Sequence, residues 1–162
     1  MRNAEATRER IMEAALDEFS AYGIAGARVD RIAKNAGCNK NLIYVYFENK
    51  ETLFTTVLER HLTRVYEEID FTPEDLAGYA KRVFDWAMTN PQIVRLMSWY
   101  SLERKEDTLS ERASVRDKKI KAIMNAQNEG LVGKTFTPGF LLTAIMALAT
   151  AWTPTQIGRA HV

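Results

Sequence analysis

The sequence contains one cysteine and two histidines among 162 residues. A single cysteine excludes a disulfide framework, and together with two histidines it excludes a zinc site built from cysteine and histidine ligands. The sequence also lacks a nucleophile–base pair, a metal-ligand spacing and a glycine-rich phosphate loop. We therefore expect no enzyme activity, no metal and no cofactor.

Glycine and proline are scarce as well, with eight and four residues, and no segment shows the sustained alternation of apolar and polar residues, with β-branched side chains, that indicates a strand. Helical spacing of apolar residues prevails, which predicts an all-α fold of about eight helices. The longest apolar stretch, residues 136–152, is interrupted by Thr, Pro and Gly and is shorter than the ~20 residues of a membrane span. The first residues lack the apolar core of a signal peptide. These absences predict a cytoplasmic protein without a membrane partner.

The charges are nearly balanced: the sequence has 22 Lys and Arg residues and 21 Asp and Glu residues, which gives a net charge of +1. Such a balance gives no overall attraction to nucleic acid. DNA binding therefore requires a local concentration of basic residues.

Capping residues, glycines and prolines predict where the helices begin and end. The first helix is expected from about Ala6 to Tyr22, with Gly23 closing it, and a long helix begins after the cap Asn49. Thr72-Pro73 is expected to start a helix that runs to about Thr89, and Asn90-Pro91 and Thr137-Pro138 are expected to start two others.

Two short helices form a helix-turn-helix candidate at about residues 28–47. The first covers residues 29–36, the second runs from Lys40 to about Phe47, and Gly37-Cys38-Asn39 is the turn between them. Helical spacing turns one set of side chains inward, namely Ile32, Cys38, Ile43 and Phe47. It turns another set outward, namely Lys40, Asn41, Tyr44 and Tyr46. Such a helix fits the major groove of DNA.

The outward residue types suit base and phosphate contacts. Asn41 can bond adenine at two atoms, and Lys40 can reach guanine or a phosphate. Lys50 lies at a helix start, where free backbone N–H groups can help it to hold a phosphate. Residues 31–47 contain basic side chains and no acidic one. Periodicity alone equally fits a helical bundle with solvated lysines.

Longer strings of residues are similar to the N-terminal signature of the TetR family of bacterial transcriptional regulators. They are Tyr22-Gly23, Ile32-Ala33, Ala36-Gly37-Cys38-Asn39, Ile43-Tyr44-Val45-Tyr46-Phe47 and Lys50-Glu51-Thr52-Leu53, and the similarity covers about residues 6–60. The resemblance implies a DNA-binding domain at residues 1–49 and a helical effector-binding and dimerisation domain at residues 50–156. It also implies a homodimeric repressor on a palindromic double-stranded operator, released by a small-molecule effector.

Carried over by position, the resemblance implies DNA contacts by Arg28, Asn39, Lys40, Asn41, Leu42, Tyr44, Tyr46 and Lys50. Arg28 stands where the family usually has a hydroxyl residue that caps the helix, and Asn41 and Leu42 stand where Gly or Pro and Thr are frequent. The absence of this cap leaves an alternative open, a small-molecule-binding helical protein that no longer binds an operator.

Two further groups of apolar residues are candidates for binding sites in the second domain. An effector pocket is predicted from Phe84, Trp86, Met88, Met97, Trp99 and Tyr100, although core packing explains each of them equally well. A dimer interface is predicted from Leu141, Leu142, Ile145, Met146, Leu148 and Trp152. The alternative for this segment is a fully buried helix.

The end of the chain departs from the family. A ninth helix is usual there, but only ten residues follow Trp152. Residues 157–162 match the translation of a common sequencing adapter, so we expect an artefactual tail and a missing last helix.

Overall fold

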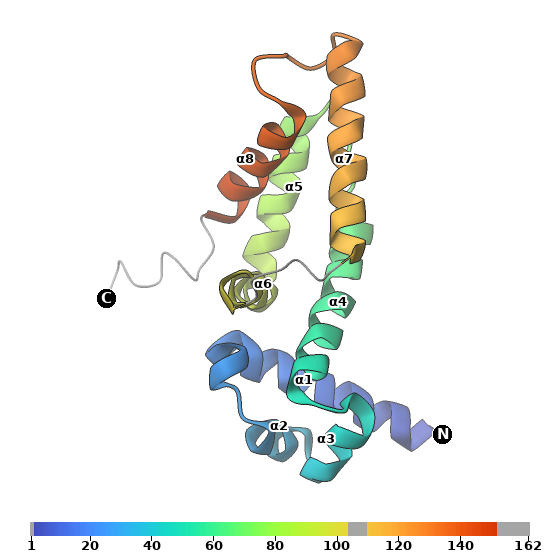
Figure 1. The fold of residues 1–162 in the computed structure, drawn as a ribbon, viewed down its shortest axis with the longest axis vertical. Helices are drawn as coiled ribbons and strands as arrows, with labels where there is room; N and C mark the ends of the chain where they lie inside the picture. Colours follow the sequence, from blue (N-terminus) through green and yellow to red (C-terminus); the bar gives the residue numbers. More distant parts are fainter. Residues whose placement is uncertain (1, 104–109, 152–162) are drawn as a thin grey trace, which may run out of the picture. The chain divides into compact units, whose positions relative to one another are not determined.

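The computed structural model describes residues 2–103 and 110–151, and all regular structure in these ranges is helical (Figure 1). Eight helices follow one another there: α1 (Arg2–Gly26), α2 (Val29–Ala36), α3 (Lys40–Phe47), α4 (Lys50–Glu68), α5 (Leu76–Thr89), α6 (Pro91–Glu103), α7 (Ser110–Asn128) and α8 (Pro138–Ala151). The all-α prediction is confirmed. Within the described ranges, no helix combines the length and the apolar character that a bilayer span requires.

Local chemistry sets the boundaries of α2 and α3 as predicted. Gly37 ends α2 in the left-handed conformation (φ 63°, ψ 41°), where its N–H bonds back to the carbonyl of Lys34. Asn39 caps α3, because its side-chain oxygen accepts the N–H of Asn41 at 2.9 Å. The three-residue turn of the helix-turn-helix candidate is therefore built by its own residues.

Two predicted boundaries are wrong. The first helix does not end at Tyr22: Gly23 is a kink (φ 68°, ψ −176°), and one more turn follows, in which the N–H of Ala27 bonds to the carbonyl of Gly23. The fifth helix does not begin at Pro73, because residues 72–75 close a turn through the Asp75 N–H and the Thr72 carbonyl. Asp75 is the cap instead, accepting the N–H of Gly78 at 2.8 Å.

Contacts within the chain form two compact units. The first unit is Met1–His61 with Gln92–Lys105, and the second unit is Leu62–Pro91 with Glu106–Val162. α6 thus belongs to the same unit as α1, α2 and α3, although two elements separate it from them in the sequence. These units describe packing, and the functional division at residue 49 stays a prediction.

Aromatic packing holds the first unit together. Phe19 of α1 meets Phe54 of α4 edge to face, with ring centroids 5.1 Å apart, and Tyr100 of α6 stacks on Phe54 with a centroid distance of 6.3 Å. All three side chains are buried, as are Ile32 and Ile43 from α2 and α3. Burial of this kind contributes about 1.5–3 kcal/mol for each large apolar side chain, so these contacts hold the short helices in place.

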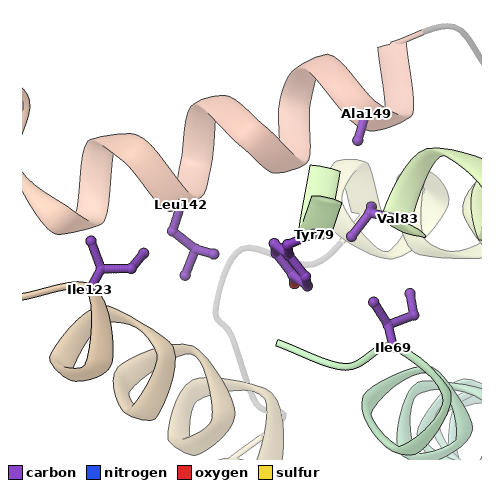
Figure 2. Close-up of a cluster of buried hydrophobic side chains, with 6 residues drawn as sticks. All are labelled: Ile69, Tyr79, Val83, Ile123, Leu142 and Ala149. Carbon is purple, nitrogen blue, oxygen red and sulfur yellow. The ribbon is translucent and has the colours of Figure 1, made fainter. Parts of the chain in front are cut away.

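The second unit has a core of its own (Figure 2). Leu142 and Ala149 of α8 face Tyr79 and Val83 of α5, and the other members of the cluster are Ile69 and Ile123. Lys119 of α7 lies against this core, with its ammonium 2.8 Å from the hydroxyl of Tyr79, and burial lowers the pKa of Lys119.

Candidate nucleic-acid interface

The inner face of the helix-turn-helix is packed as its sequence predicts. Ile32, Ile43 and Phe47 are almost completely buried, and Cys38 is half-buried in the turn. Burial raises the pKa of the Cys38 thiol, and the positive charge of Arg10 lowers it by a smaller amount. The thiol therefore stays protonated near neutral pH. The apolar side of α3 is therefore buried, and its opposite side is exposed and can contact a partner.

The outer face of α3 presents polar and apolar groups together. Lys40, Asn41 and Tyr44 are exposed, with Tyr44 at 41%. Val45 is 77% exposed and was not among the predicted contacts. Its spacing of four residues from Asn41 places both on one side of the helix, which is the signal that could have identified it. A valine methyl suits contact with the methyl group of thymine.

The other predicted contact residues of this segment are half-buried or already hydrogen-bonded within the chain. Tyr46 is half-buried, and its hydroxyl donates to the carbonyl of Ala4 at 3.3 Å, which attaches the first turn of α1 to α3. Asn39 is exposed but uses its side-chain oxygen in the helix cap, and Leu42 is half-buried. Of the two tyrosines, Tyr44 is thus the one that faces solvent.

Acidic side chains from outside residues 31–47 neutralise part of the predicted basic face. Asp30 pairs with Lys40 at 3.0 Å and raises the pKa of Lys40. Glu18 pairs with Arg31 at 2.6 Å, and the guanidinium of Arg31 also lies over the ring of Tyr22. Because the pair of Lys40 and Asp30 is exposed, it is weak, and a phosphate or base can replace the carboxylate.

The start of α2 is held by a residue that sequence reasoning missed. Arg28 is the N-cap and makes no side-chain capping bond, as predicted. Its backbone N–H donates to Glu18 at 2.7 Å, and Arg31 donates to the same carboxylate at 2.8 Å. Burial raises the pKa of Glu18, but the bonds from Arg31 and Arg28 outweigh it, so the net shift is downward. Glu18 is 4% exposed, so its role is internal, while the Arg28 side chain stays exposed.

Lys50 lies at the start of α4, next to the start of α2. Asn49 caps α4 by accepting the N–H of Thr52 at 2.7 Å, as predicted. The ammonium of Lys50 donates to the carbonyl of Ala27 at 3.3 Å and is half-buried. The ammonium of Lys50 is therefore held at the carbonyl of Ala27, the residue that precedes the N-cap Arg28 of α2.

The six predicted pocket residues fall into different units. Phe84 and Trp86 are half-buried against the core of the second unit, and Met88 is exposed. Met97, Trp99 and Tyr100 belong to the first unit, where Tyr100 stacks on Phe54 and Trp99 bonds to α1. The effector pocket stays a prediction.

The predicted dimer residues on α8 divide by exposure. Leu142 is buried in the core of its own unit, and Leu141, Ile145 and Met146 are half-buried against that core. Leu148 is 76% exposed. Trp152 and the expected tail, residues 157–162, lie outside the described residues. Among the predicted interface residues that the structure describes, Leu148 is therefore the one most exposed to a partner.

Family comparisons agree with this architecture in both halves of the chain. The family described as "Bacterial regulatory proteins, tetR family" matches residues 11–57, and "Tetracyclin repressor-like, C-terminal domain" matches residues 75–162. The chain belongs to the TetR family. It is 36% identical to the HTH-type transcriptional repressor SCO4008 of Streptomyces coelicolor over 151 residues, which are 91% of this chain and 79% of that protein.

Other relatives match smaller parts. The HTH-type transcriptional repressor NicS of Pseudomonas putida is 30% identical over 62% of this chain and 51% of its own. The solved structure of SCO4942 from Streptomyces coelicolor superimposes with a TM-score of 0.85 at 38% identity, covering 95% of this chain and 83% of that one. The TetR-family assignment therefore rests on sequence and fold together, and the relatives are transcriptional regulators.

Proposed function

We propose that this TetR-family regulator acts as a cytoplasmic, homodimeric repressor that binds a palindromic operator and is released by a small molecule. The observation that carries the proposal is the division of α3 into a buried face and an exposed face with Lys40, Asn41 and Tyr44. In a dimer, two copies of α3 would enter successive major grooves, ~34–36 Å apart.

A gel-shift titration with DNA from upstream of the protein's own gene tests operator binding. The full chain is expected to retard this fragment at concentrations that leave an unrelated fragment of equal length free. Equal affinity for both fragments, or none, would contradict the repressor proposal and favour a helical small-molecule binder without an operator.

The release step draws support from the fold. In a protein of the same fold, FadR from Bacillus subtilis, stearoyl-CoA is bound (TM-score 0.73, 16% identity). We propose a small-molecule effector for this chain as well, with Phe84, Trp86, Met88, Met97, Trp99 and Tyr100 as candidate contacts. Leu148, with the other predicted residues of α8, is the candidate for dimer contact.

Asn41→Ala is expected to cost ~1–3 kcal/mol of binding free energy on the selected operator and to relax the preference at one base pair. The reason is that Asn41 is exposed on α3 and its amide can pair with two atoms of adenine. Fluorescence anisotropy on the operator and on its single-base variants measures both effects. Asn125→Ala, at an exposed position of α7, is the matched control, and a uniform loss on all duplexes would count against base reading.

Lys50→Ala is expected to weaken operator and unrelated DNA to a similar degree. Removing one phosphate contact should flatten the slope of log affinity against log salt by about one. The measurement is a salt titration of both duplexes, with Lys121→Ala on α7 as a control of equal charge change. An unchanged slope in Lys50→Ala would show that Lys50 does not bind a phosphate.

A further inference from the structure

The kink in α1 separates a backbone carbonyl and an N–H group that would otherwise bond to each other. In an unbroken helix the carbonyl of Ser20 would accept the N–H of Ile24, four residues later. At the kink, Gly23 has φ 68° and ψ −176°, outside the helical region. Groups of this kind cost free energy when they are left unbonded away from water. The kink therefore depends on donors and acceptors from elsewhere.

α6 supplies a partner for each of these groups. The indole N–H of Trp99 donates to the carbonyl of Ser20 at 3.2 Å. The N–H of Ile24 donates to both carboxylate oxygens of Glu103 at 3.1 Å, and the N–H of Ala25 donates to one of them at 3.1 Å. Trp99 and Glu103 are four residues apart and so lie on one face of α6. One face of one helix thus satisfies both sides of the break.

Further contacts extend this face along α1. Gln92, near the start of α6, donates to the carboxylate of Asp17 at 3.0 Å. A Cβ atom added to Gly23 would lie 2.9 Å from the ring of Trp99 and even closer to the carboxylate of Glu103. α6 therefore touches the backbone of α1 directly at the kink, where a side chain would not fit.

The kink lies between the two points that fix α2. Glu18, five residues before Gly23, binds the N–H of Arg28 and the side chain of Arg31. Ala27, four residues after Gly23, accepts the bond from Lys50. A change in the angle of the kink would therefore move the start of α2 relative to the rest of α1. The position of α3, which follows α2 by three residues, depends on the same angle.

We propose that Trp99 and Glu103 are positioning residues for operator binding, which hold α1 in the bend that places α2 and α3 on DNA. The proposal rests on the proposed repressor function. It also gives Trp99 a role different from lining an effector pocket.

Two conservative variants of the full chain test the proposal. Trp99→Phe keeps an aromatic ring but removes the N–H donor, and Glu103→Gln keeps the size but removes the charge and one acceptor. Leu102→Ala is the control, because Leu102 is 78% exposed on the same helix. The DNA probes are a duplex that the wild-type protein selects from a random pool and an unrelated duplex of the same length.

Each variant is expected to bind the selected duplex about 3- to 30-fold more weakly and the unrelated duplex with unchanged affinity. Hydrogen exchange of the Ile24 and Ala25 amides, measured without DNA, is expected to quicken in Glu103→Gln and to stay unchanged in Leu102→Ala. A general loss of folded protein would instead lower binding to both duplexes equally, and that result would overturn the positioning role.

Wild-type affinity for the selected duplex in both variants would overturn the positioning role while leaving the repressor proposal intact. Failure of the wild-type protein to select any duplex would contradict the repressor proposal. The exchange of the Ile24 and Ala25 amides still reports in that case whether Glu103 holds the kink. The two failures are therefore distinguishable.

Discussion

Gly23→Ala is expected to lower the free energy of unfolding by about 2–6 kcal/mol. At φ 68° and ψ −176° the backbone of Gly23 occupies a region that is essentially restricted to glycine, at a cost of about 1–3 kcal/mol for other residues. The added methyl group would also collide with Trp99 and Glu103, and such overpacking costs about 1–3 kcal/mol more. Urea denaturation followed by circular dichroism, at a fixed protein concentration, measures the loss.

Gly37→Ala is the matched control for this prediction. Gly37 also has a positive φ of 63°, but nothing lies within 4 Å of the Cβ that alanine would add. Gly37→Ala should therefore lower the free energy of unfolding only by the strain of alanine in the left-handed conformation, about 1–2 kcal/mol. Equal losses in the two variants would show that contact with α6 contributes nothing at Gly23.

Glu18→Gln is expected to destabilise the protein by about 2–3 kcal/mol at neutral pH. The carboxylate is buried and accepts bonds from the Arg28 N–H and the Arg31 guanidinium, and bonds to a charged group contribute about 1.5–3 kcal/mol. Glutamine offers one uncharged acceptor in the same place. Glu13→Gln, at an exposed position of the same helix, should change stability by less than about 0.5 kcal/mol.

The pH dependence of Glu18→Gln follows from the direction of the shift. The folded pKa of Glu18 lies below its ordinary value of 4.5. A carboxyl group of this kind contributes its full stabilisation above 4.5 and loses it as the pH falls through the folded pKa. The difference in stability between wild type and Glu18→Gln should therefore shrink on acidification below pH 4.5. A constant difference between pH 7 and about pH 3 would show that folding does not lower the pKa of Glu18.

Elements whose boundaries are set by neighbouring residues could be predicted from the sequence. The turn between α2 and α3 depends on Gly37 and Asn39, which act on groups within five residues of themselves. The predicted start of α5 is wrong because two capping signals compete there, and Asp75 rather than Thr72 caps the helix. Local patterns thus identify a helix more reliably than its first residue.

Contacts between distant residues could not be predicted. Glu103 and Ile24 are 79 positions apart, and neither residue type indicates a bond between a carboxylate and a backbone N–H. The start signal Asn90-Pro91 predicted a helix but carried no information on which unit that helix joins. The charge of the predicted DNA-binding face has the same limit. Residues 31–47 contain no acidic side chain, but Asp30, one residue before them, pairs with Lys40 in the fold.

The membership of α6 in the first unit has a consequence for dissecting the protein. The unit is discontinuous in the chain, because residues 62–91 separate its two parts. A fragment that stops at His61 would keep α1, α2 and α3 but would lack the partners of Ser20 and Ile24. The DNA-binding half therefore cannot be excised as one stretch of sequence with its kink still supported. A chimera that transplants residues 1–61 onto another family member would need a matching α6 in the recipient.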